Sequence, residues 1–142
     1  RSVQSDDRLD ELIAKADAEH QKDPGNPAPM KQLVDLLCRR ERKEEESRAI
    51  GLLVGEYKRG GEYRWKHLAD EVRMKQLGRE VREAEKAGDA AVLKEKQIAQ
   101  LRFELSVFKE RVDKYPTDNR ARFDDAARVP FLDDALNEES TT

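Results

Sequence analysis

The chain has 142 residues, of which 42% are charged and 37% hydrophobic, and its formal net charge is −3. This length suits one compact domain or a few stacked helical repeats. The two signs of charge are interspersed without a basic face, which argues against nucleic-acid binding. The apolar runs fall short of the roughly 18 residues that a membrane span needs, so we expect no membrane contact within this segment.

Further features of the composition bear on order and compartment. The apolar residues recur at helical spacing, which predicts ordered helices rather than disorder, except at the two ends. The single cysteine, Cys38, excludes an intramolecular disulfide and fits a reducing compartment. A cytoplasmic location is therefore favoured, with a soluble domain of a larger envelope protein as the alternative. Because the sequence begins with Arg1 instead of methionine, we expect it to be part of a longer protein.

Three amphipathic helices are predicted in the first 60 residues. The first covers 6–22, with Asp6 or Asp7 as its N-cap and Asp23-Pro24 as its end. The second starts in the turn that contains Pro27 and Pro29 and runs to about Arg40. The third covers about 44–58 and is closed by Gly60-Gly61. Their apolar stripes comprise Leu9, Leu12, Ile13, Ala16 and His20, then Met30, Leu33, Val34 and Leu37, then Ala49, Ile50, Leu53, Val54 and Tyr57.

A basic stretch, Arg39-Arg40-Glu41-Arg42-Lys43, separates the second and third helices. Three glutamates, Glu44-Glu45-Glu46, follow it directly. This neighbouring negative charge favours a solvated corner between two helices over a phosphate-binding patch.

The next part of the chain predicts a long helical hairpin. Two helical patterns cover 62–87 and 90–115, and Ala87-Gly88-Asp89 reads as a turn between them. The alternative is one continuous bent helix through Gly88, and the hairpin is favoured over it. The apolar residues expected along its seam are Trp65, Leu68, Val72, Ile98, Leu101, Leu105, Phe108 and Val112. A short helix within 118–131 and a polar tail at 132–142 complete the prediction.

Two proline turns mark the ends of helical units. Pro24 and Pro116 lie 92 residues apart, which is two periods of about 34 residues plus about 24. Helix–turn–helix repeats have that 34-residue period. The surplus is accounted for if both helices of the long hairpin are extended about equally.

The residues at these spacings resemble the tetratricopeptide repeat, whose first helix follows the pattern W-x2-L-G-x2-Y. Trp65, Leu68, Ala69 and Val72 match that spacing, and Leu33, Val34 and Leu37 match it one repeat earlier. Phe108 precedes Pro116 by eight residues, as the second-helix aromatic of the family precedes its closing proline. The segment from Leu101 through the Tyr115-Pro116-Thr117-Asp118 turn resembles tetratricopeptide proteins of planctomycete bacteria. The chain departs from the family at Glu46 and Glu104, which replace small residues, and at Asp125, which replaces leucine.

The resemblance implies an all-α fold of antiparallel helical hairpins, an α-solenoid with one elongated, coiled-coil-like hairpin. The whole of 1–142 would then be one helical-repeat region. It would comprise a second-type helix at 6–23, a repeat at 27–60, the elongated hairpin at 62–116, the first helix of a further repeat at 118–131 and the tail.

The implied function is a non-catalytic scaffold that binds a protein or peptide partner. The candidate binding surface carries Lys31, Asp35, Lys66 and Asp70. Related domains bind a C-terminal carboxylate with Lys and Asn, and the aspartates here would repel one. The alternative is a spacer or oligomerisation module built on the hairpin at 62–116, with self-association. His20 and His67 lie far apart without paired ligand spacing, so we expect no metal, no cofactor and no catalytic residues.

Overall fold

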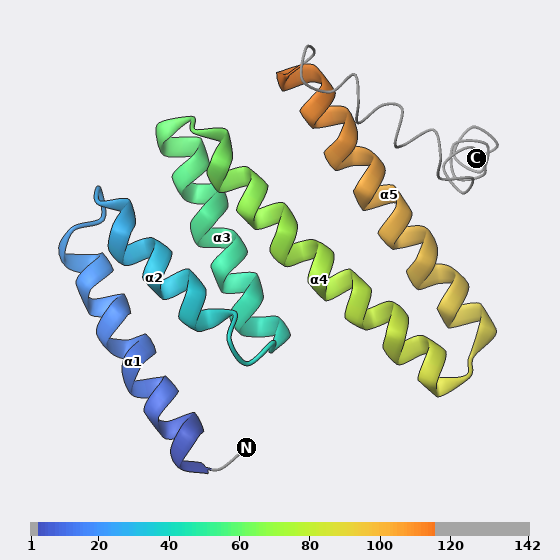
Figure 1. The fold of residues 1–142 in the computed structure, drawn as a ribbon, viewed down its shortest axis with the longest axis horizontal. Coiled ribbons are helices and arrows are strands. Elements are labelled where there is room, and N and C mark those ends of the chain that lie inside the picture. The colour runs from blue at the N-terminus through green and yellow to red at the C-terminus, as the bar shows by residue number, and fades with distance from the viewer. Residues whose placement is uncertain (1–2, 116–142) are drawn as a thin grey trace. The chain divides into compact units, whose positions relative to one another are not determined.

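A computed structural model describes residues 3–115, and within that range the chain forms five α-helices and no strands (Figure 1). They are α1 (Val3–Lys22), α2 (Pro27–Leu37), α3 (Lys43–Gly60), α4 (Tyr63–Ala87) and α5 (Ala90–Lys114). The all-α class is therefore confirmed. The helix expected within 118–131 and the tail at 132–142 lie outside the described residues.

The described chain divides into two compact units, with the boundary between Arg73 and Met74 inside α4. The first unit contains α1, α2, α3 and the start of α4, and the second contains the rest of α4 together with α5. Among residues 3–115, no helix is both long enough and apolar enough to cross a membrane.

The first unit is built around α2, which packs against α1 and against α3 (Figure 1). Met30, Leu33, Leu37 and Leu53 are fully buried in its core. All four helices of the unit contribute to this core, which also includes Leu9, Ala16, Val34, Leu36, Ala49, Trp65 and Ala69. Most of the predicted apolar stripe residues thus meet in one core, as the 3.6-residue period requires.

The turns of the first unit follow the local chemistry of their residues. Pro27 and Pro29 lie in the first turn of α2, as predicted, and the Asn26 side chain caps that helix by accepting a hydrogen bond from the Ala28 N–H at 3.1 Å. Gly61 ends α3 with φ 77°, and its N–H donates to the Tyr57 carbonyl at 2.7 Å. This left-handed conformation is accessible to glycine at little cost, which confirms the predicted glycine cap.

Two predicted helix ends are wrong. Helix α1 begins at Val3, before Asp6 and Asp7, because residues 3–5 include no helix breaker and the Asp6 carboxylate is engaged in an ion pair with Arg42. Helix α2 ends at Leu37, short of Arg40. The chain turns sharply after it, and Glu41 adopts a positive φ of 56°. The sequence has no glycine or proline between Leu37 and Lys43 to mark this turn, so periodicity alone extended the predicted helix too far.

In the second unit, the part of α4 after Arg73 runs antiparallel to α5 (Figure 1). Gly88 joins the two helices with φ 75°. Asp89 caps α5, and its carboxylate accepts hydrogen bonds from the N–H groups of Ala91 at 3.1 Å and Val92 at 3.3 Å. The predicted hairpin is therefore confirmed over the continuous helix, and α4 and α5 have 25 residues each.

Candidate partner-binding surface

The four residues predicted to bind a partner form two ion pairs in the first unit. Lys31 Nζ lies 2.7 Å from Asp35 Oδ1 on α2, and Lys66 Nζ lies 2.6 Å from Asp70 Oδ1 on α4. Both pairs join residues four apart on one helix, where side chains are neighbours. Each lysine is therefore neutralised by an aspartate of its own helix.

The two ion pairs differ in exposure. The Asp35 side chain is 60% exposed, whereas the Asp70 side chain is only 4% exposed. Asp70 Oδ1 accepts a hydrogen bond from Lys66, and Asp70 Oδ2 is buried without a hydrogen-bond partner among the described residues. A buried carboxylate oxygen without a donor is costly. The α2 pair is thus the one that presents both side chains to solvent.

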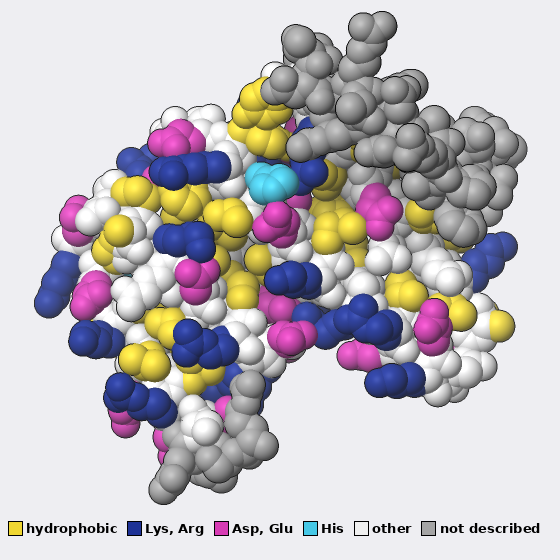
Figure 2. Space-filling model, viewed as in Figure 1, with side chains coloured by type: hydrophobic (Ala, Val, Ile, Leu, Met, Phe, Trp, Pro, Cys, Tyr) yellow, Lys and Arg dark blue, Asp and Glu magenta, His cyan; other side chains and the backbone are white. Residues whose placement is uncertain are grey.

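Charged groups surround the start of α4. His67 Nε2 lies 2.9 Å from Glu71 Oε1, and the guanidinium of Arg64 lies 4.3 Å from the centre of the Trp65 ring. Figure 2 shows basic and acidic side chains interspersed on the face it displays. In the described part of the chain, no three His, Cys, Asp or Glu side chains are grouped so that they could hold a metal ion.

The residues predicted to form the hairpin seam lie in both units. Trp65 is buried in the core of the first unit, Leu68 packs against that core, and Val72 is half-buried. In the second unit, Leu105 is buried. The other predicted seam residues of α5 are half-buried: Ile98, Leu101, Phe108 and Val112.

The described contacts between α4 and α5 come from another side of α5. Lys96 Nζ lies 3.3 Å from Glu80 Oε1, and a side chain at Gly78 would meet the Gln100 amide at 3.9 Å. Lys96 and Gln100 share one side of α5, and Leu101 and Leu105 lie about 100–180° away from them around the helix. Contact of the seam residues across the hairpin therefore stays a prediction.

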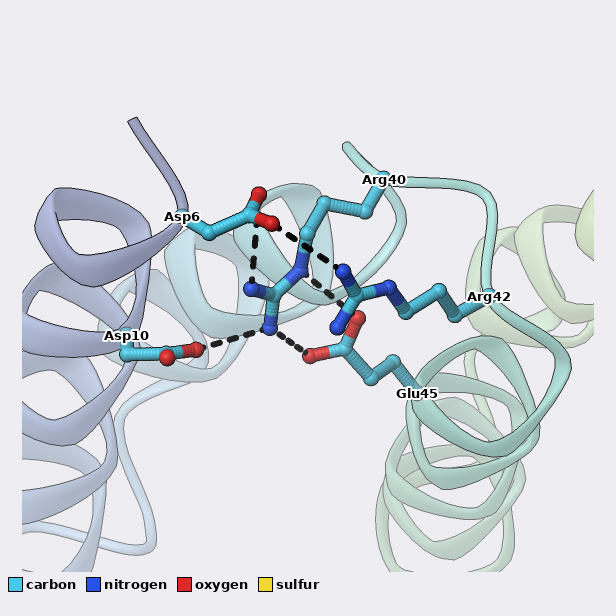
Figure 3. A network of polar contacts seen from close by, with 5 residues as sticks. All are labelled: Asp6, Asp10, Arg40, Arg42 and Glu45. Carbon is cyan, nitrogen blue, oxygen red and sulfur yellow. Dashed lines mark hydrogen bonds and ion pairs between the residues drawn. The ribbon is translucent and has the colours of Figure 1, made fainter. Parts of the chain in front are cut away.

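A second group of charged side chains surrounds Arg40, in the turn after α2 (Figure 3). The Arg40 side chain is only 5% exposed. Its Nε and Nη2 donate to the two carboxylate oxygens of Glu45 on α3, at 3.1 and 2.5 Å. Its Nη2 also donates to Asp10 on α1 at 2.8 Å, and its Nη1 lies 3.8 Å from Asp6. Arg42 Nη2 completes the network with a 3.2 Å contact to Asp6.

The geometry of this network explains why an arginine can be buried there. A planar guanidinium matches the two oxygens of a carboxylate, and its remaining donors reach further acceptors. The hydrogen bond to Glu45, followed by that to Asp10, raises the pKa of Arg40 above its ordinary value against the opposing effect of burial. Arg40 is therefore charged at neutral pH.

The prediction of a solvated corner is wrong for Arg40. Its partners include Asp10, which lies 30 residues earlier in the chain, so no local pattern around Arg40 reveals the contact. The available signal was the pair Asp6 and Asp10, which are four residues apart and therefore on one side of α1. Two acidic residues on one face of a helix predict a basic neighbour but do not identify it.

Comparison of the chain with protein-family models, with curated proteins and with solved structures finds no match.

Proposed function

We propose that the chain is a non-catalytic protein–protein interaction scaffold of the tetratricopeptide-repeat type. The observation that supports this is a repeated arrangement on α2 and on the start of α4. Each arrangement begins with a large apolar residue of the same core, which is Met30 on α2 and Trp65 on α4. The next residue is a lysine, and it forms an ion pair with an aspartate four positions later. The two arrangements are 35 residues apart. That spacing is close to the period of the family.

The charges of this surface limit the chemistry of the partner. Each lysine is offset by an aspartate, so the surface presents ion pairs rather than a net charge. A free C-terminal carboxylate would be repelled by Asp35. A partner segment with side chains of both signs fits better, because it can pair with Lys31 and Asp35 at once. Such rim contacts contribute to specificity and association rate more than to affinity.

Capture of partners from an extract of the source cells tests the proposal. The bait is the chain with Lys31→Ala and Asp35→Ala, compared with the unsubstituted chain. The matched control is Arg8→Ala with Glu11→Ala, which removes another exposed ion pair, on α1. A partner that binds the unsubstituted chain and the control but not the Lys31/Asp35 variant supports the proposal. Equal capture by all three baits contradicts this surface as the binding site, provided that circular dichroism shows equal helix content.

A second candidate function is a structural spacer or oligomerisation module built on the long hairpin. The observation that favours it is the length of α4 and α5 together with the half-buried stripe of Ile98, Leu101 and Phe108 on α5. Leu101→Asp should then lower the mass measured by light scattering, since a charge in an apolar contact between copies is unfavourable. Val92→Asp, at an exposed position of the same helix, is the control. An unchanged monomeric mass for all three chains contradicts this function.

A further inference from the structure

One side of α1 is attached to the rest of the first unit through ion pairs made by three of its aspartates. These aspartates meet arginines that lie after α2 and on α3. The contacts are Asp6 with Arg42 at 3.2 Å and with Arg40 at 3.8 Å, Asp10 with Arg40 at 2.8 Å and Asp17 with Arg48 at 3.0 Å. The three aspartates are spaced four and seven residues apart, which places them on one stripe of the helix.

The apolar attachment of α1 is smaller than that of α2. Among residues 5–22 of α1, Leu9 and Ala16 are buried, and Leu12 and Ile13 pack partly against the core. By contrast, α2 buries five residues in eleven. A helix of 20 residues that is detached from its neighbours is only marginally stable in water. The folded state of α1 therefore depends on this docking.

The surface under α1 also has contacts that do not involve α1. Arg40 is held by the two hydrogen bonds to Glu45, which belongs to α3 and not to α1. The buried residues Leu33, Leu37, Ala49 and Leu53 join α2 to α3 in the core. Four residues, 23–26, connect α1 to α2, so α1 can move away without disturbing a longer segment.

We propose that α1 is a salt-sensitive strap, which opens as a unit at raised ionic strength while α2 and α3 stay folded. The ion pairs that hold it are partly accessible to counterions, since the Asp10 side chain is 60% exposed and the Arg42 side chain 53% exposed. The Arg40 side chain is 5% exposed, so its pairs are screened less than the others. The distance beyond which salt screens the attraction between exposed charges falls from about 8 Å at physiological ionic strength to about 3 Å at 1 M salt. The surface uncovered by opening carries Arg40, Arg42 and Arg48 beside the core that Leu9 and Ala16 had covered. This inference is independent of the proposed scaffold function.

Hydrogen exchange of the full chain, followed by mass spectrometry in 20 mM and 500 mM NaCl, tests the strap. We expect the amides of α1 to exchange about tenfold faster at the higher salt concentration, because screening the contacts of each of the three aspartates contributes about a twofold to threefold change. The amides of α2 and α3 should change little, since local opening leaves their hydrogen bonds intact. Equal acceleration in α1 and α2, or no change in α1, would overturn the proposal.

Two matched variants separate these ion pairs from a general effect of charge. The first variant carries Asp6→Asn, Asp10→Asn and Asp17→Asn. The amides of α1 should exchange rapidly in this variant already at 20 mM NaCl, and their exchange rate should lose most of its salt dependence. The control carries Asp7→Asn, Glu11→Gln and Glu19→Gln, which are exposed acidic residues of the same helix. It removes the same number of charges and should keep the salt dependence. Identical behaviour of the two variants would overturn the proposal, and if the first variant fails to fold, the salt response of the unsubstituted chain decides.

Discussion

Asp10 on α1 and Arg40 in the turn after α2 are 30 residues apart in sequence and joined by a hydrogen bond of 2.8 Å. The same guanidinium binds both oxygens of Glu45 on α3, so one side chain connects three helical elements of the first unit. Removal of this buried arginine should be strongly unfavourable, because it leaves the three carboxylates around it without their shared cation.

Arg40→Ala should lower the thermal unfolding temperature measured by circular dichroism. The substitution leaves Glu45, Asp10 and Asp6 close together without their shared cation, and like charges repel. Arg40→Lys should recover only part of the loss, since an ammonium cannot bind both oxygens of Glu45 in the same fork. The control is Arg8→Ala, which breaks an exposed pair on α1. Equal unfolding temperatures for Arg40→Ala and Arg8→Ala would refute a structural role of the network.

Gly51→Ala and Gly55→Ala should each stabilise the protein by about 0.5–1 kcal/mol, because glycine inside a helix costs conformational entropy. A Cβ atom at either position in α3 meets no other atom within 4 Å. Gly61→Ala should instead destabilise by about 1–2 kcal/mol, since its φ of 77° is strained for any residue with a Cβ. Urea denaturation of the three variants checks the predicted opposite signs. A destabilised Gly51→Ala variant would show that this face of α3 is covered.

Leu53→Ala should destabilise the protein by about 2–5 kcal/mol, because it opens a cavity in a packed core. Leu53 is fully buried on α3, in the centre of the first unit. The control, Val92→Ala, changes an exposed residue of α5 and should alter stability by no more than about 0.5 kcal/mol. Denaturant unfolding monitored by circular dichroism measures both values. Similar losses for the two substitutions would contradict the assignment of the core.

Glu104→Gln should stabilise the protein at pH 7 and have little effect near pH 4. Burial raises the pKa of Glu104 from its ordinary 4.5. The folded state therefore holds this proton more tightly than the unfolded state does, so stability is fully present below pH 4.5 and is lost as pH rises through the folded pKa. Glutamine carries no charge and removes that loss. The measurement is urea denaturation at both pH values.

The control for this prediction is Glu95→Gln, at an exposed position of α5. Its effect on stability should be about the same at the two pH values. A stabilisation of Glu104→Gln that is as large at pH 4 as at pH 7 would contradict a contribution from the ionised carboxylate.

The helical elements could be predicted because their signals are local. Gly88 and Asp89 marked the turn of the long hairpin, and the structure has a left-handed glycine and a capping aspartate at those positions. Where a contact between distant residues competed with a local signal, the prediction was less accurate. Asp6 is a good capping residue, but its carboxylate pairs with Arg42, and α1 begins at Val3.

The position of the candidate surface could be predicted from the sequence, but the ion pairing and the exposure of its side chains could not. The repeat spacing located Lys31, Asp35, Lys66 and Asp70. Whether their charges are free or paired, and how far each is exposed, depends on distances between side chains that a residue pattern does not contain. Two similar pairs accordingly differ, with Asp35 mostly exposed and Asp70 buried.

The sequence by itself determined the all-α class, the positions of the turns and most of the core residues, because helix periodicity, proline and glycine act within a few neighbouring residues. Tertiary structure alone decided the partners of Arg40 and the acidic stripe of α1. Those contacts join residues from different helices, and a buried charge is stable only where folding brings its counter-charges within hydrogen-bond distance.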